Sequence, residues 1–535
     1  MIYDFVIVGA GSAGATLAAR LSKDPAVQVA LVEAGPDYRS ADAPEAMGSP
    51  NPGRIIMDPE FARFRWDALT ARRTRTQKPR TYWRGRGMGG SSSVNGQIAI
   101  RGVVEDYDDW ARSGCEGWSF KDVLPAFRRL ERDLRYGDEP WHGADGPIPI
   151  YRAPVSLWGA VDQALAESAL DLGYPWAPDH NRPGALGVSP YAINSQDGRR
   201  VSVNDAYLEP ARGRNNLAVF GGCLVDCLLF EGDRAVGVRR LGADGAHELR
   251  GEEVILCAGA VHSPTILLRS GIGPEHHLAE FGVAPRAILP VGDAFQDHPG
   301  VFLPLTLKPF AVAPEGFRHT NLCVRYSSEL AGAGPGDMMM VSMNTVGDSL
   351  GRHVEGADQP RLGLVAVWVN QCFSRGQVRL ASLDPAAQPL VEENMLDDPR
   401  DRERLRDGVR RLLEIARRPA TQAIGEMAPL PFDPTDEDAL DAFALATAGD
   451  TQHATSTCAM GAADDPRAVV DPDCRVRGLR GLRVVDASVL PFVPRANTHL
   501  TTVMIAEVMA ERMLAGRRLG RQSAAPSLTA PAPAA

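Results

Sequence analysis

The chain has 535 residues, of which 44% are hydrophobic and 23% are charged, and its formal net charge is −10 at pH 7. This length allows roughly two or three structural domains around a large core. The acidic balance argues against nucleic acid or an anionic membrane surface as a main partner. The sequence contains no run of eighteen apolar residues, so no membrane span is expected.

The cysteines and the first residues bear on the compartment. The eight cysteines form no C-x-x-C pair and show no zinc spacing, which indicates buried thiols in a reducing compartment and no metal site. An apolar strand begins at residue 2, so we expect no secretory signal. These features predict a cytoplasmic enzyme.

Residues 3–35 predict a dinucleotide-binding unit. Residues 3–8 have the composition of a buried parallel strand, and they lead through GAGSAG into a helix over residues 12–22. In this loop Gly9 permits the tight turn, Gly11 lets the backbone approach a pyrophosphate, and Gly14 lets the helix pack closely on the strand. The helix N-terminus faces that pyrophosphate.

A second strand over residues 27–32 is followed by Glu33, nineteen positions after Gly14. A carboxylate at this place can accept hydrogen bonds from both ribose hydroxyls and would repel a 2′-phosphate. Strand, glycine loop, helix, strand and acid together predict an ADP-containing cofactor.

A second glycine-rich segment, RGRGMGGSSSVN over residues 84–95, has few side chains large enough to form a core. Gly89 and Gly90 allow close backbone approach, and the serines and Asn95 offer donors to an anionic pyrophosphate or to an isoalloxazine edge. A flexible linker is the alternative, but linkers do not carry Met88, Val94 and the apolar residues 98–100.

Four segments resemble the signatures of the glucose–methanol–choline (GMC) oxidoreductases. GRGMGGSSSVNGQIAIRGVVEDYD (85–108) resembles the first signature and GAVHSPTILLRSGIG (259–273) resembles the second. HATSTCAMG (453–461) and LRVVDASVLPFVPRANTHLTTVMIAE (482–507) resemble the catalytic and flavin-contacting stretches. The resemblance implies FAD, bound between a nucleotide-binding domain and a substrate domain, and a reaction that oxidises a primary alcohol to the aldehyde by hydride transfer to flavin N5.

The resemblance also implies how FAD is held. Choline-oxidising members have a histidine joined covalently to the flavin at the position of Val94, and valine has no nucleophile, so non-covalent FAD is expected. Val225 is expected to contact the adenine through its backbone. The residues expected to bind the cofactor are Gly9, Gly11, Ser12, Ala13, Gly14, Glu33, Ala34, Arg86, Met88, Gly89, Gly90, Ser91, Asn95, Gly96, Val225, Ala258, Gly259, Asp486, Ala487, Asn497 and Thr498.

The expected fold class is α/β and α+β, with a discontinuous Rossmann-like FAD-binding domain and an antiparallel-sheet substrate domain. The FAD-binding domain is expected at residues 1–154, 205–300 and 450–515, and the substrate-binding domain at 155–204 and 301–449. Strands are predicted at 217–220, 224–230, 235–239, 253–257, 362–369 and 376–380, and helices at 399–415 and 501–514. The tail 516–535 is rich in Ala, Pro and Ser and is predicted to be disordered.

Two of the eleven histidines stand apart as candidates for catalysis. Oxidation beside a flavin needs a base for the hydroxyl proton, and histidine suits this role because its pKa lies near working pH. His453 and His499 each lie in a loop of small polar residues. By resemblance, His453 is the nearly universal base, and His499 occupies a second catalytic position that is His or Asn in different members.

Two imidazolium charges in one confined site repel, so we expect at most one of the pair to carry a proton at rest. His499 is then expected to hold the alcohol C–H in place. His262 is expected to be structural, and for residues 296–298, which resemble a flavin-adjacent loop, a structural role is about equally open. The remaining histidines are expected to be surface or satisfied core residues: His142, His180, His247, His276, His277, His319 and His353.

The expected substrate is a small aromatic or heteroaromatic CH2OH compound, because segments such as YGDEPWHGADGPIPI resemble bacterial members acting on such alcohols. O2 or a quinone or dye is expected to reoxidise the flavin. Choline, an aliphatic alcohol or a sugar remains open as substrate. A flavin-containing hydroxynitrile lyase is the alternative from another class, and a fatty-acid photodecarboxylase and an NAD dehydrogenase are weaker alternatives.

Overall fold

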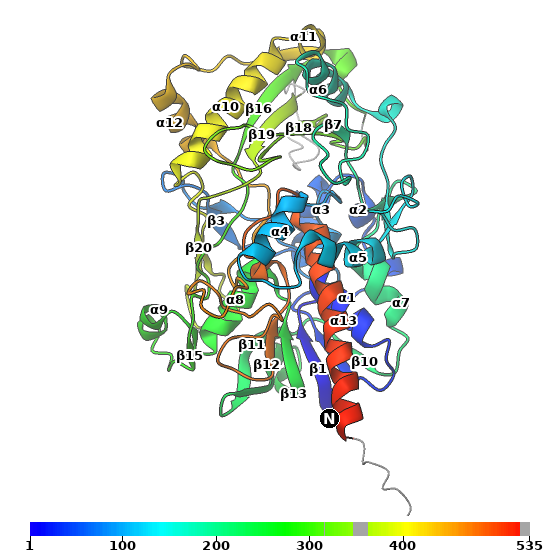
Figure 1. The fold of residues 1–535 in the computed structure, drawn as a ribbon, viewed down its shortest axis with the longest axis vertical. Coiled ribbons are helices and arrows are strands. Elements are labelled where there is room, and N and C mark those ends of the chain that lie inside the picture. The colour runs from blue at the N-terminus through cyan, green and yellow to red at the C-terminus, as the bar shows by residue number, and fades with distance from the viewer. Residues whose placement is uncertain (315, 346–361, 525–535) are drawn as a thin grey trace, which may run out of the picture.

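The computed structural model describes residues 1–314, 316–345 and 362–524, and two β-sheets dominate it (Figure 1). The lower sheet in Figure 1 has seven strands in the order β10-β2-β1-β13-β12-β11, with β23 beside β13. Its strands are β1 (Ile2–Val8), β2 (Val29–Val32), β10 (Leu217–Phe220), β11 (Leu224–Glu231), β12 (Arg234–Gly242), β13 (Gly245–Leu256) and β23 (Leu482–Val484).

In the lower sheet β10, β2, β1, β13 and β23 run parallel, whereas β12 and β11 extend it by antiparallel hairpins. β1, β2, β23 and the last residues of β13 are mostly apolar and buried, as strands covered on both faces must be, whereas β10 at the edge is half-buried. Three separate pieces of the chain contribute strands to this sheet. β13 is longer than the strand predicted at 253–257, because its first half pairs with β12.

The upper sheet is antiparallel and has six strands in the order β22-β16-β19-β18-β17-β7 (Figure 1). Helices α6 (Ala160–Asp171) and α10 (Pro399–Ala416) pack on it through Val161, Leu165, Leu405 and Leu412. Its strands are β7 (Gly187–Pro190), β16 (Gly300–Leu307), β17 (Leu322–Tyr326), β18 (Met338–Met343), β19 (Leu362–Val369) and β22 (Gly425–Met427). The expected fold class, a Rossmann-like unit with an antiparallel-sheet unit, is confirmed.

A third, smaller sheet crosses the predicted domain division. It joins β3 (Thr70–Arg72) and β4 (Arg80–Thr81) to β20 (Gln377–Arg379) and β21 (Leu390–Glu392). Residues from 301–449 therefore pair here with residues from 1–154, so this stretch contributes to more than the upper sheet. The domain boundaries themselves remain a prediction.

Shorter elements connect the sheets. The other helices are α2 (Glu45–Gly48), α3 (Gly53–Met57), α4 (Val104–Arg112), α5 (Phe120–Leu130), α7 (Glu209–Ala211), α8 (Gly259–Arg269), α9 (Glu275–Glu280), α11 (Pro419–Ile424) and α12 (Glu437–Thr447). Three strand pairs lie apart: β5 (Glu131–Asp133) with β6 (Ile148–Ile150), β8 (Ser195–Gln196) with β9 (Arg199–Arg200), and β14 (Ile272–Gly273) with β15 (Ala287–Ile288).

The last helix, α13 (Thr498–Ala524), is longer at both ends than the helix predicted at 501–514. It lies beside α1 (Ser12–Leu21) against the lower sheet (Figure 1). The disorder predicted from residue 516 is wrong as far as Ala524, because Arg517 forms ion pairs with Asp4 and Glu252 and fixes these turns to the sheet. The rest of the predicted tail, 525–535, lies outside the described residues. Within the described part of the chain, none of the helices has both the length and the apolar character that a membrane span requires.

Candidate functional site

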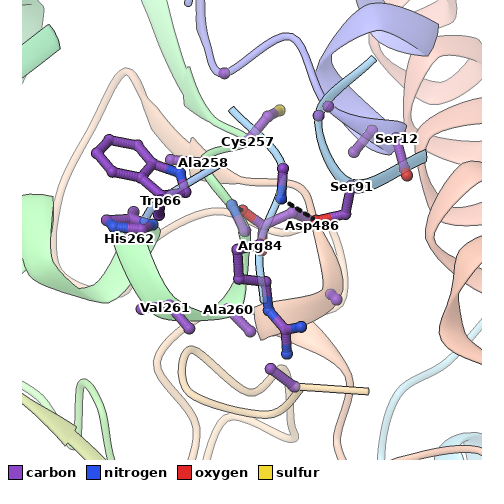
Figure 2. Close-up of a pocket in the computed structure, with 18 of the residues that line it drawn as sticks. Ser12, Trp66, Arg84, Ser91, Cys257, Ala258, Ala260, Val261, His262 and Asp486 are labelled. Carbon is purple, nitrogen blue, oxygen red and sulfur yellow. Dashed lines mark hydrogen bonds between the residues drawn. The ribbon is translucent and has the colours of Figure 1, made fainter. Parts of the chain in front are cut away.

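A cavity of about 370 Å³ opens at the carboxyl ends of β1, β2 and β13, where α1 and α8 begin (Figure 2). In open parallel sheets this edge is where ligands bind. Both glycine-rich segments and both predicted catalytic histidines line it. The predicted residues in its wall are Gly9, Gly11, Ser12, Ala13, Glu33, Ala34, Gly90, Ser91, Asn95, Gly96, Val225, Ala258, Gly259, His453, Asp486, Ala487, Asn497, Thr498 and His499.

The three glycines of the first loop serve different purposes. Gly9 has a φ of +101°, and a Cβ there would lie 2.5 Å from the Cys257 carbonyl oxygen. A Cβ on Gly14 would lie 1.8 Å from the Gly9 oxygen, so this glycine permits the close contact of helix and strand. At Gly11 a Cβ would meet only the Gly90 Cα, at 3.9 Å. A Cβ on Gly90 would lie 2.7 Å from the Gly11 Cα, so the two glycine-rich segments touch here, and the space beside Gly11 is open to a group such as a pyrophosphate.

Glu33 joins the two glycine-rich segments. Its buried carboxylate accepts hydrogen bonds from the backbone N–H groups of Ala10 (2.8 Å), Gly35 (2.8 Å) and Gly87 (2.9 Å). Burial raises the pKa of this carboxyl, and the three N–H donors oppose that rise. The sequence predicted a ribose contact for Glu33; the structure adds that this carboxylate holds the loop shape.

Four predicted cofactor residues do not line the cavity: Gly14, Arg86, Met88 and Gly89. They support the wall from behind. Arg86 donates to the Ala34 carbonyl at 3.1 Å, the Met88 carbonyl accepts from the Tyr38 and Ser93 hydroxyls, and Gly89 donates to the Ala10 carbonyl at 2.9 Å. These contacts give the four residues a supporting place behind the wall, and cofactor binding by them stays a prediction.

Asp486 connects the last piece of the chain to the start of α8. Its carboxylate accepts from the Gly259 N–H at 2.8 Å and from the hydroxyls of Ser263 and Ser488, both at 2.5 Å. Figure 2 shows it between the α8 end of the cavity and Ser91. On the far side His262 stacks on Trp66, with ring centroids 4.1 Å apart. This aromatic wall was not expected from the sequence.

His453 lies in the cavity wall with both ring nitrogens engaged. Its Nε2 is 2.9 Å from the amide nitrogen of Asn497. Its Nδ1 is 2.7 Å from the Thr451 hydroxyl and 2.9 Å from Nδ1 of His298. Asp297 accepts from the backbone N–H of His453 at 2.7 Å. The loop at 296–298, for which sequence alone left two roles open, therefore contacts the predicted base.

His499 lies elsewhere in the same cavity. As the second residue of α13, it places Nδ1 3.1 Å from the Ser12 hydroxyl, at the first turn of α1. Its Nε2 is buried with no hydrogen-bond partner. The sequence paired His499 with His453, whereas the structure brings Asn497 to His453 and sets His499 beside the first glycine loop.

Burial favours the neutral form of His298, His453 and His499, as it does for His262 in the cavity wall. Burial lowers the pKa of His453 well below its usual value, and His298 and Arg84 lower it further. Burial lowers the pKa of His298 to about 4 and that of His499 to about 4. At pH 7 each is a neutral imidazole, a form that can accept a proton.

Matches to known proteins agree with this geometry. The model of the GMC oxidoreductase family matches residues 3–300 with its N-terminal part and 372–506 with its C-terminal part. A 5-(hydroxymethyl)furfural oxidase of Methylovorus sp. (strain MP688) is 38% identical, over 96% of this chain and 99% of that protein.

Two other relatives act on different alcohols by name. An oxygen-dependent choline dehydrogenase 1 of Chromohalobacter salexigens is 35% identical, over 96% of this chain and 94% of that protein. The crystal structure of pyridoxine 4-oxidase from "Mesorbium loti" superposes with a TM-score of 0.86 at 30% identity, covering 96% of this chain and 99% of that one.

Proposed function

This chain belongs to the GMC oxidoreductase family of FAD-dependent enzymes that act on alcohols, and from that premise we propose that it oxidises a small, uncharged aromatic or heteroaromatic primary alcohol to the aldehyde. The observation that carries the proposal is the position of His453 in the cavity wall, with Nε2 2.9 Å from the Asn497 amide nitrogen, where burial lowers the pKa of the ring and so favours the neutral imidazole. FAD, when bound, accepts the hydride that leaves the carbinol carbon.

The residues present fit FAD. The open space at Gly11, the donors of the Ser91 segment and the carboxylate of Glu33 suit a pyrophosphate and a ribose. The buried, unpartnered Nε2 of His499 lacks a hydrogen-bonding group that a bound ligand would supply. We assign His499 to the cofactor side of the cavity, with Ser12 orienting its ring.

FAD is held non-covalently in this proposal. Val94, at the position where some members attach the flavin, is buried in the cavity wall and offers only hydrocarbon. Acid or heat precipitation of the yellow protein is expected to leave the flavin in the supernatant. Flavin that stays with the precipitate would contradict the assignment.

His453 acts as the general base in the proposed reaction. Its neutral Nε2 takes the hydroxyl proton, and the Asn497 amide, which lies 2.9 Å from Nε2 in the structure, transfers its hydrogen bond to the alcohol oxygen when the substrate binds. Arg84 lines the same end of the cavity and reaches Gln452, the residue before His453, at 2.9 Å. Its guanidinium lies 4.0 Å from the buried Asp297 carboxylate, so the two charges offset each other.

A cationic substrate such as choline needs a carboxylate or an aromatic cage beside its ammonium group. The apolar lining from Pro52, Ile56, Trp83 and Ile98 instead suits a flat neutral ring. This contrast favours the hydroxymethylfurfural-type alcohol over choline.

Anaerobic mixing with benzyl alcohol, furfuryl alcohol, 1-hexanol and choline tests the proposal. The aromatic alcohols should bleach the flavin fastest, and choline slowest. No bleaching by any alcohol would instead favour a hydroxynitrile lyase type of function, which needs no flavin turnover. Admission of air, and separately of a quinone, then shows which acceptor reoxidises the reduced protein; we propose O2, as in the relatives named oxidases.

A separate pair of variants tests the proposal that Asn497 contacts the substrate and that His499 lies on the cofactor side. Asn497→Ala is expected to slow anaerobic flavin reduction about 10- to 100-fold, which is the effect of losing one hydrogen bond to a charged group, and to leave FAD affinity unchanged. His499→Ala should weaken FAD retention and change the reduction rate of flavin still bound much less. The opposite pattern would restore His499 to the substrate side.

A further inference from the structure

Behind His453 lies a buried carboxylate, Asp297, on which hydrogen-bond donors converge from three segments. The Thr451 hydroxyl is 3.1 Å from Oδ1 and the Tyr82 hydroxyl is 2.8 Å from Oδ2. The backbone N–H groups of His298 and His453 reach the same carboxylate, each at 2.7 Å. An ionised carboxylate only accepts hydrogen bonds, so all four contacts are satisfied without a proton on Asp297.

The charge of this carboxylate is balanced by Arg84. The guanidinium lies 4.0 Å from Oδ2 of Asp297 and also contacts the Tyr82 hydroxyl. Both the anion and its surroundings are buried, where a hydrogen bond to a charged group counts for more than it does in water.

The single hydroxyl hydrogen of Thr451 indicates which ring nitrogen of His453 carries the hydrogen. A hydroxyl has one hydrogen, and Thr451 gives it to Asp297, because a carboxylate oxygen has none to give. Toward Nδ1 of His453, 2.7 Å away, the Thr451 oxygen can then only accept. Nδ1 must therefore carry the hydrogen, and Nε2 of the neutral ring keeps its lone pair.

Two other contacts fit the same tautomer. The Nδ1 atoms of His298 and His453 are 2.9 Å apart, and with the His298 hydrogen on Nε2 its Nδ1 lone pair shares the one Nδ1 hydrogen of His453 with the Thr451 oxygen. On the opposite side, the amide nitrogen of Asn497 lies 2.9 Å from Nε2 of His453 and donates to a lone pair there. Both contacts agree with the hydrogen count on Thr451.

We infer that Asp297 and Thr451 are positioning residues that hold His453 in the tautomer whose Nε2 faces the substrate and that stabilise the imidazolium formed during the reaction. The inference rests on the proposed function. As the alcohol O–H bond breaks, the proton moves to Nε2 of His453 and the electron pair of that bond stays on oxygen. FAD, when bound, would take the hydride from the carbon. Throughout, Nδ1–H donates to Thr451 and Asp297 stays unprotonated.

The pair Thr451→Val and Thr451→Ser separates this role from packing. Valine keeps the branched shape and removes the hydroxyl, whereas serine keeps the hydroxyl. In the FAD-loaded protein, reduced anaerobically by the best alcohol of the panel, Thr451→Val should lower the limiting reduction rate roughly 10- to 100-fold with little change in alcohol affinity. Thr451→Ser should recover most of that loss.

A matched control lies in the same loop. Thr455 is also buried, but its hydroxyl donates to the Gln296 carbonyl at 3.3 Å, so Thr455→Val should reduce at the wild-type rate. Wild-type rates in Thr451→Val, or a Thr451→Ser variant as slow as Thr451→Val, would overturn the inference.

A second measurement does not depend on turnover or on FAD content. In protein labelled with 15N in its histidine rings, the His453 signals are identified by their loss in His453→Gln. Nδ1 should appear protonated in the wild type and in Thr451→Ser, and lose part of that character in Thr451→Val. An unprotonated Nδ1 in the wild type refutes the inference. If no alcohol reduces the wild type, the proposed function fails while the NMR result still tests the tautomer.

Discussion

His142 and His453 are both buried and both lie beside carboxylates, yet the structure gives them opposite proton affinities. The His142 ring touches an acid on each side, with Nδ1 2.6 Å from Glu131 and Nε2 2.9 Å from Asp179. Burial alone would lower its pKa, but these two contacts outweigh burial and the pKa of His142 is raised. The two anions therefore favour the cationic form of His142.

Around His453 the carboxylate contacts the backbone and not the ring. Asp297 accepts from the His453 N–H, and the ring itself meets the neutral groups of Thr451, His298 and Asn497. Burial therefore dominates, and the pKa of His453 falls well below its usual value.

The two clusters also differ in their ion pairs with arginine. Arg101 and Arg152 pair with Glu131 and Asp133 at 2.6 and 2.8 Å, so the His142 cluster is a closed network of ions. Only the His453 cluster opens onto the cavity. The comparison teaches that a buried histidine near acids becomes a base when its ring nitrogens face neutral partners and a cavity.

The largest expected effect is on His453. His453→Ala removes the base, and general-base catalysis contributes about 10²- to 10⁴-fold, so flavin reduction should slow by that factor. The flavin spectrum and the unfolding midpoint should change little. Stopped-flow reduction under anaerobic conditions measures the rate, and a variant as fast as the wild type would place the base elsewhere.

His142 should respond in the opposite way. His142→Gln removes the cation shared by Glu131 and Asp179, and breaking a buried ion pair costs about 3–5 kcal/mol in the free energy of unfolding. Flavin reduction by alcohol should stay close to the wild-type rate because this cluster does not line the cavity. Denaturant unfolding measures the loss of stability, and the stopped-flow assay measures the rate of flavin reduction. A His142→Gln variant with wild-type stability and slow flavin reduction would contradict the proposed difference between the two histidines.

Much of this organisation could be predicted from local sequence. The first glycine loop and its flanking strands were placed within a few residues, because turn chemistry and apolar runs are local signals. Two features could not be predicted locally, because each depends on a partner that is distant in sequence. Glu33 supports the loops by accepting from the Gly87 N–H, and Arg517 is ordered by its ion pair with Asp4.

The contact between His453 and Asn497 could not be predicted from local sequence. Asn497 and His499 are two positions apart, and α13 begins between them at Thr498, earlier than predicted. Successive side chains turn by about 100° along a helix. A shift in the helix start therefore decides which of the two side chains meets His453 and which meets Ser12.

The smallest expected effect is a pair of opposite pH slopes in stability. The pKa of His142 is raised above 6.5 in the folded state, so its stabilisation is present below about pH 6.5 and is lost as the pH rises through the folded pKa. The pKa of His453 is lowered in the folded state, so the unfolded chain binds more protons below about pH 6.5 and the wild type loses stability as the pH falls.

Thermal unfolding of the wild type, His142→Gln and His453→Gln at several pH values, with FAD at a fixed concentration, separates the two slopes. The advantage of the wild type over His142→Gln should shrink as the pH rises. Its advantage over His453→Gln should instead grow with pH up to about 6.5 and then level off, because above that value both states of His453 are neutral. Slopes of the same sign would mean that the two buried histidines do not differ in protonation.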